Sequence, residues 1–140
     1  MDDFSSWLVQ HGLKEAFTTN AGDSLYINKE QNFGVLRKKG EYGTHSFYLD
    51  DILEFKTYDD ENLIVSWTPN FPMKISERST RHSTNEVFIK IFFKDRRVLK
   101  LQIFHGIHGN IRRNTNEHIN LLNYSCQISQ IFINCITGNC

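Results

Sequence analysis

The sequence predicts an α+β fold, in which a small antiparallel β-barrel or sandwich carries a short N-terminal helix and a C-terminal capping helix. Three observations predict this class. Apolar residues alternate with polar ones through much of residues 23–105, which is the pattern of half-buried strands. Eleven phenylalanines among 140 residues indicate an aromatic core carried by strands. Residues 114–137 show instead the period of an amphipathic helix.

The N-terminal helix is predicted within residues 1–20. Phe4, Trp7, Leu8 and His11 recur near a 3.6-residue period, and a helix over residues 3–17 accounts for this spacing. The stretch TNAGD at residues 19–23 is rich in turn-forming residues. We therefore expect the helix to end before this turn and the strands to begin after it.

Antiparallel hairpins are expected across residues 23–105. One joins the strand around Leu25 and Ile27 to Phe33–Leu36 through a polar turn at 29–32. The strongest hairpin signal is EVFIKIFFKDRRVLKLQIF, which turns at Asp95-Arg96.

Acidic residues mark two further turns. Asp50-Asp51 precedes a predicted strand, and Asp59-Asp60-Glu61 separates that strand from the next one. No histidine or third ligand lies nearby in sequence, so these carboxylates are predicted to turn the chain rather than to hold a metal.

The C-terminal helix is predicted from a start signal and an apolar face. Asn114 and Glu117 have the spacing of a capping box, with asparagine as the N-cap. Leu121, Leu122 and Phe132 lie on the apolar face and are predicted to be buried. The whole chain, residues 1–140, is expected to form a single domain.

Composition argues against several classes of function. Sixteen basic and sixteen acidic residues disfavour a general nucleic-acid binder, and no apolar run reaches the roughly 20 residues of a transmembrane segment. The three cysteines, Cys126, Cys135 and Cys140, lie near the C-terminus without CxxC spacing, which favours a cytoplasmic protein and disfavours a disulfide framework or zinc ribbon.

No cofactor, metal or catalytic activity is predicted. The glycines of HGIHG at residues 105–109 favour a loop over a helical histidine pair for a metal. Neither a nucleophile elbow nor a phosphate-binding glycine loop occurs, so we expect that the chain is not an enzyme.

Four segments together resemble a family of uncharacterised bacterial and phage domains with a pleckstrin-homology-like (PH-like) fold. They are SLYINKEQNFGVL, HSFYLDDILEFKTYDDENLI, NEVFIKIFFKDRRVLKLQIF and the amphipathic C-terminal helix, which together span roughly residues 20–136. The resemblance implies a small barrel capped by a helix, and binding rather than catalysis. The zinc ribbon and the glycine-rich insertion of some relatives do not occur in this chain.

We therefore expect a binding module whose partner is another protein or a peptide. A small inhibitor or adaptor encoded by a phage or mobile element is the concrete version that the resemblance implies. The alternative is a module that binds anionic lipid or nucleic acid through basic loops. The candidate binding residues are cationic or aromatic and lie in predicted loops or strand ends: Arg37, Lys38, Lys39, Tyr42, Arg78, Arg81, Arg96 and Arg97.

Overall fold

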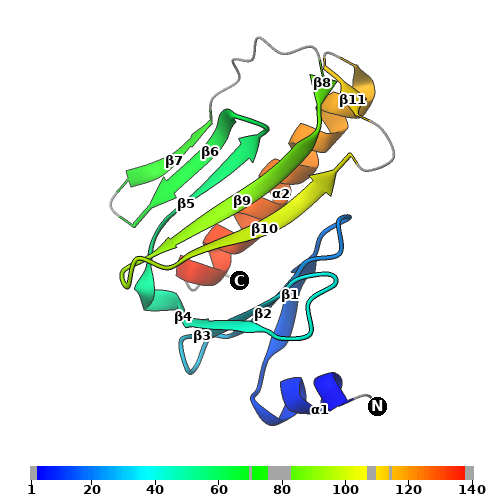
Figure 1. The fold of residues 1–140 in the computed structure, drawn as a ribbon. Helices are drawn as coiled ribbons and strands as arrows, with labels where there is room; N and C mark the ends of the chain where they lie inside the picture. Colours follow the sequence, from blue (N-terminus) through cyan, green and yellow to red (C-terminus); the bar gives the residue numbers. More distant parts are fainter. Residues whose placement is uncertain (1–2, 70, 76–82, 107–109, 114, 138–140) are drawn as a thin grey trace.

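Two antiparallel sheets and a long helix surround one core (Figure 1). The computed structural model describes residues 3–69, 71–75, 83–106, 110–113 and 115–137. The first sheet has the order β1 (Lys14–Thr18), β2 (Ser24–Asn28), β3 (Phe33–Arg37), β4 (His45–Tyr48). The second has the order β10 (Val98–His105), β9 (Glu86–Phe93), β5 (Ile52–Asp59), β6 (Asn62–Thr68), β7 (Phe71–Ile75). The short strands β8 (Ser83–Thr84) and β11 (Ile111–Arg112) pair with each other.

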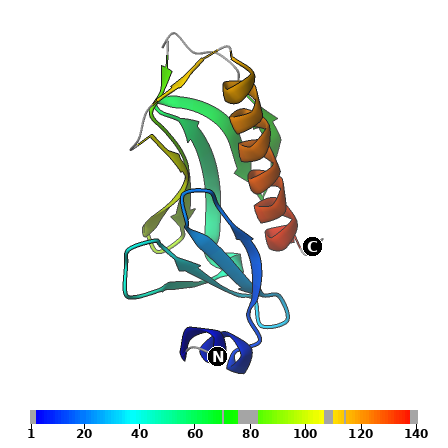
Figure 2. The same ribbon diagram turned by 90° about the vertical axis from the view of Figure 1, so that its right-hand side faces the viewer.

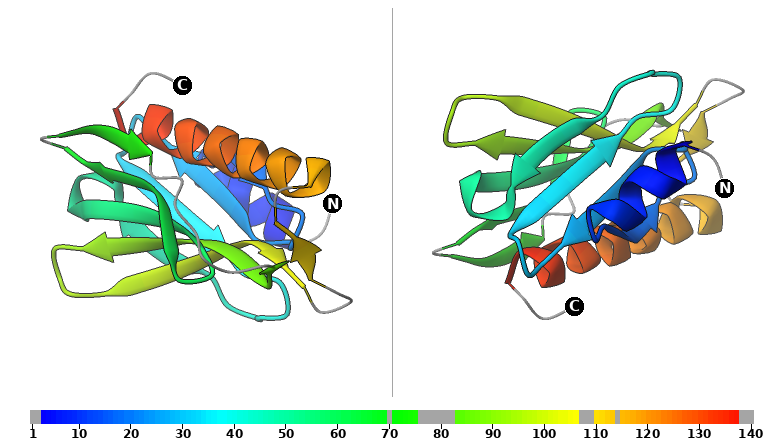
Figure 3. Two further views of the ribbon diagram at one scale, coloured as in Figure 1. Left: turned by 90° about the horizontal axis from the view of Figure 1, so that it is seen from above. Right: turned by 90° about the horizontal axis from the view of Figure 1, so that it is seen from below.

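The α+β class is confirmed, but the predicted barrel is wrong, because the strands do not close. The chain passes from the first sheet to the second through the 3₁₀ turn η1 (Leu49–Asp51). Among the described strands, none pairs across from one sheet to the other. Figure 3 shows the two sheets from above and below, with the C-terminal helix α2 (Asn116–Thr137) running along one side. The PH-like architecture therefore stays an expectation.

The N-terminal helix is shorter than predicted. Helix α1 spans Asp3–Gln10, and residues 14–18 form β1 instead of continuing the helix. Gly12 adopts a φ of +65° and donates its N–H to the carbonyl of Val9, while Leu13 donates to Leu8. This is a Schellman termination, which glycine favours because it has no Cβ to clash in the left-handed conformation. The apolar pattern of residues 13–17 belongs to a strand that pairs with β2.

The predicted hairpins are confirmed. β2 and β3 pair across a turn at residues 29–32, where Asn32 has a φ of +57°. β9 and β10 pair across a turn in which Arg96 has a φ of +71°. The acidic residues also turn the chain as expected, because Asp51 ends η1 and Asp60, with a φ of +54°, links β5 to β6.

Helix α2 covers one face of the second sheet, while none of the described helices or strands covers the other face of β5, β9 and β10 (Figures 1 and 2). Phe132 is fully buried, 5.1 Å from Phe55 of β5 between ring centroids, and the hydroxyls of Ser129 and Thr57 lie 2.8 Å apart. Leu121 is buried as predicted, whereas Leu122 is only half-buried. In the described part of the chain, no helix combines the length and apolar character needed to cross a membrane.

The N-terminal cap of α2 differs from the predicted one. The Oγ1 atom of Thr115 accepts a hydrogen bond from the backbone N–H of His118 at 3.2 Å, which is the bond an N-cap makes to the third helical residue. Asn114, the predicted cap, lies outside the described residues. With Thr115 as the cap, Glu117 is no longer at the capping-box position.

Candidate functional site

Side chains bridge the seam between the two sheets where strand pairing would have closed a barrel. The carboxylate of Asp23, only 3 % exposed, accepts the backbone N–H of Gln102 on β10 at 2.8 Å. Thr19 donates its hydroxyl to the carbonyl of the same residue, and the ammonium of Lys38 donates to the carbonyl of Lys100 at 2.6 Å. These bonds pair backbone N–H and C=O groups on the outer edge of β10 with side chains. Another strand therefore cannot add to this edge without displacing them.

A cleft of about 500 Å³ lies beside this seam. It is bounded by the β1–β2 turn, the end of β10, β11 and the first half of α2. The side chains of its lining are partly apolar and partly polar. The apolar ones are Ala21, Phe104, Ile111, Leu121 and Tyr124, and the polar ones are Asn20, His105, Glu117 and Asn120. An apolar surface with a few polar groups is the usual lining of a ligand-binding cleft.

A second, more polar hollow of about 390 Å³ adjoins the cleft, because His105 lines both. Among the described residues, its lining includes the carboxylates of Asp60, Glu61 and Glu86 but no lysine or arginine. Glu117 adds a carboxylate to the cleft, where His105 is the sole basic residue in the described part of the lining. A ligand that spans both hollows therefore meets apolar surface at one end and carboxylates at the other.

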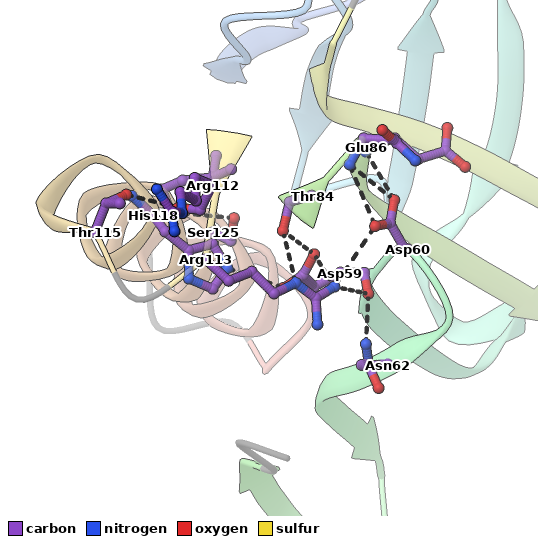
Figure 4. Close-up of polar contacts among 12 residues, drawn as sticks. Asp59, Asp60, Asn62, Thr84, Glu86, Arg112, Arg113, Thr115, His118 and Ser125 are labelled. Carbon is purple, nitrogen blue, oxygen red and sulfur yellow. Dashed lines mark hydrogen bonds and ion pairs between the residues drawn. The ribbon is translucent and has the colours of Figure 1, made fainter. Parts of the chain in front are cut away.

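A buried ionic network holds the elements around these hollows together (Figure 4). Asp59 lies at its centre: one carboxylate oxygen accepts from Thr84 at 2.7 Å and from the Arg113 guanidinium at 3.0 Å. The other oxygen lies 3.1 Å from Nε2 of His118. All four residues are buried, and Asp60 places a second carboxylate 3.5 Å from Arg113. The network thus joins the end of β5 to β8, to the segment after β11 and to α2.

Sequence reasoning predicted the acidic turn but missed this network. Asp60 has the predicted role, since it turns the chain between β5 and β6 with a φ of +54°. Its carboxylate also accepts the backbone N–H groups of Asn85 and Glu86. Asp59, in contrast, points into the protein with Phe55 and Thr57, which lie four and two residues before it on β5. The period-two alternation of this strand was the available signal, because a residue in phase with two buried ones is itself expected to be buried.

Two of the predicted binding residues, Arg97 and Lys38, connect the first sheet with the second. Arg97, in the turn between β9 and β10, donates from Nη1 to the carbonyl of Ser46 on β4 at 2.7 Å, and its guanidinium lies 4.7 Å from the Phe93 ring centroid. Arg96 in the same turn is exposed. Lys38, which follows β3, contacts β10 through Lys100 as described above.

The remaining predicted residues are dispersed. The Arg37 guanidinium lies 4.1 Å from the Phe4 ring centroid, where it attaches α1 to the first sheet. Lys39 and Tyr42 are exposed in the β3–β4 loop. Arg78 and Arg81 lie outside the described residues. The cleft at the seam includes none of the predicted residues that the structure describes.

The described residues contain no group of three or more histidine, cysteine or acidic side chains arranged to hold a metal ion. His105 is exposed at the end of β10, whereas His108 of the same HGIHG segment lies outside the described residues. Cys135 is buried in α2 and Cys126 is half-buried there.

No protein-family model, no curated protein and no solved structure matches this chain. The cleft, the seam and the ionic network therefore provide the physical basis for a functional proposal.

Proposed function

We propose that this chain is a non-catalytic binding module that takes a segment of another protein in the cleft at the open seam. The observation that carries the proposal is the composition of that cleft. Its volume of about 500 Å³ and its partly apolar lining suit one or two buried side chains of a peptide. Phe104 and Tyr124 supply aromatic surface, and aromatic residues contribute strongly to binding energy in interfaces.

The surrounding charges favour a partner segment with an apolar anchor followed by a basic residue. Glu117 borders the cleft, and Asp60, Glu61 and Glu86 line the adjoining hollow. A lysine or arginine side chain entering there would meet these carboxylates, of which Asp60 already lies 3.5 Å from Arg113 and Glu86 lies 3.3 Å from Lys100. A small inhibitor or adaptor that acts by capturing such a segment is the version of this function that agrees with the family resemblance.

The ionic network supports binding because it keeps the walls of the cleft in place. His118, Glu117 and Leu121 belong to the first turns of α2, and the bond from His118 to Asp59 joins those turns to β5. A preformed cleft loses less conformational entropy on binding than one that must be assembled.

The test is a substitution that fills the cleft. Asn120, exposed at its rim, is replaced in Asn120→Trp, and the control Gln127→Trp alters an exposed residue two turns further along α2 and outside the lining. Each variant and the parent protein are used to recover partners from native lysate, with identification by mass spectrometry and titration of the partner by calorimetry.

Asn120→Trp is expected to lose the partner while Gln127→Trp retains it. Glu117→Gln is expected to weaken binding about tenfold if a basic residue of the partner pairs with this carboxylate. A partner that binds the parent protein and Asn120→Trp equally well would show that the cleft is not the binding site.

A further inference from the structure

The face of the second sheet that lies opposite α2 carries a row of three lysines. Lys56 on β5 pairs directly with Lys90 on β9, and Lys90 pairs directly with Lys100 on β10. Adjacent strands lie about 5 Å apart, so three like charges are held close together. Like charges directly opposite each other destabilise a sheet. This lysine row is therefore costly to the isolated fold, and an anion would relieve the repulsion.

Acidic neighbours compensate the lysine row only at its two ends. Glu54 lies 3.8 Å from Lys56, and Glu86 lies 3.3 Å from Lys100. Within the described residues, no carboxylate lies within ion-pair distance of Lys90 at the centre. The three lysines and two glutamates leave a net charge of +1, which is centred on Lys90 of β9.

Aromatic rings lie on the same face, beside the lysine row. Tyr58 and Phe88 are direct cross-strand partners whose ring centroids are 5.4 Å apart in a stacked arrangement. Phe92 lies on the other side of the row, two residues beyond Lys90 on β9. Tyr58 and Phe92 are half-buried, whereas Phe88 is nearly covered.

The lysine ammonium groups occupy the faces of these rings. The Nζ atom of Lys100 lies 4.2 Å from the centroid of Phe88, and that of Lys56 lies 5.7 Å from the centroid of Phe92. Lys90 lies 5.9 Å from both Tyr58 and Phe88. An anion that draws the ammonium groups toward itself would therefore uncover ring faces at the same time.

We propose that this face binds single-stranded nucleic acid, with phosphates on the lysine row and bases stacked on the neighbouring aromatic rings. Both components are needed for such binding: lysines supply sequence-independent affinity for the backbone, and aromatic side chains stack with bases of any kind. An acidic peptide would use the lysines but would gain nothing from the rings as stacking surfaces. The site is separate from the seam cleft, since none of these residues lines the cleft; Glu86, which pairs with Lys100, is the one that also lines the adjoining hollow as described.

The experiment measures binding of a fluorescent oligothymidine by anisotropy across a range of salt concentrations. An abasic oligomer of equal length, a poly-glutamate peptide and anionic phospholipid vesicles serve as competing ligands. We expect a Kd of roughly 10⁻⁵ M for oligothymidine near physiological salt. About three phosphate contacts predict a slope of about −2 for the logarithm of the binding constant against that of salt concentration. The abasic oligomer should bind about tenfold more weakly because it cannot stack.

Two substitutions test the two components separately. Lys90→Gln keeps the side-chain stem but removes the central charge, and it should reduce the magnitude of the salt slope by about 0.7. Phe92→Leu keeps an apolar side chain but removes the ring, and it should weaken oligothymidine about tenfold while leaving the abasic oligomer unchanged. Lys14→Gln, at an exposed lysine of β1 in the other sheet, is the matched control and should change neither value.

Several outcomes would overturn the proposal. Undetectable oligothymidine binding at low salt would do so, as would equal affinity for the abasic oligomer. Tighter binding of poly-glutamate or vesicles would assign the face to an acidic protein or a membrane instead. An equal effect of Lys14→Gln and Lys90→Gln would show that the charge acts without a defined site. Circular dichroism of each variant tests whether a loss of binding is caused by unfolding. A variant that loses oligothymidine binding should still bind the protein partner in the seam cleft.

Discussion

Replacing Asp59 tests whether the buried ionic network holds the end of β5 to β8, to the segment after β11 and to α2. Its side chain is 5 % exposed and that of Arg113 is 3 % exposed, so both charges are almost fully removed from water. Breaking a buried pair by removing one partner costs about 3–5 kcal/mol, because the remaining charge is left uncompensated. For Asp59→Asn we expect the lower end, about 3 kcal/mol, since Asp60 stays 3.5 Å from Arg113.

Asp59→Ala should cost more than Asp59→Asn. The alanine variant also deprives Thr84 and His118 of their acceptor, and each lost bond to a buried charged group adds about 1.5–3 kcal/mol at most. Because these losses are not additive within one network, we expect the upper end of the range for a broken buried pair, about 5 kcal/mol, which is a large part of the 5–15 kcal/mol that stabilises a typical domain. Urea unfolding followed by the fluorescence of Trp67, which is buried in β6, measures the free energy of unfolding.

A double-mutant cycle separates the ion pair from general damage. Arg113→Met alone should cost about 3 kcal/mol, and the double variant with Asp59→Asn should cost clearly less than the two losses added together. Asp50→Asn, at an exposed carboxylate of η1, is the control and should change stability by less than about 0.5 kcal/mol. Additive losses, or a loss below about 1 kcal/mol for Asp59→Asn, would refute the reasoning.

Four further experiments test the core, the close approach at Gly34, the seam and the absence of a metal requirement. Phe132→Ala should cost about 3–5 kcal/mol in urea unfolding, because the ring is fully buried against the second sheet; a loss under about 1 kcal/mol would contradict that packing. Gly34→Ala should also destabilise, by about 1–3 kcal/mol, since a Cβ at Gly34 would lie 2.6 Å from Cε2 of Phe47, and unchanged stability would argue against this close approach. Asp23→Ala should speed hydrogen exchange at the amide of Gln102, which donates to that carboxylate, and unchanged protection would show that the seam is held in another way. Elemental analysis of the purified protein should find no stoichiometric zinc, and loss of fold on chelation would overturn that expectation.

Local patterns in the sequence determined the elements of this fold. The alternation of Leu25 with Ile27, and the turn at residues 29–32, predicted the β2–β3 hairpin because strand period and turn chemistry act between near neighbours. The helical face that contains Leu121 and Phe132 predicted α2 for the same reason. The misjudged element, the helix over residues 3–17, failed where Gly12 terminates it, so the decisive signal was also local.

Only the tertiary structure decided what these elements do together. Asp59 and Arg113 are 54 residues apart in sequence, and Asp23 and Gln102 are 79 apart, so no local period relates them. Alternation placed Lys56, Lys90 and Lys100 on outer faces of their strands, but the register of three strands aligned them in one row. The open seam, the cleft beside it and the lysine row all depend on contacts between distant segments. Such contacts form only when the whole core is assembled, because packing rather than propensity selects the register of a sheet.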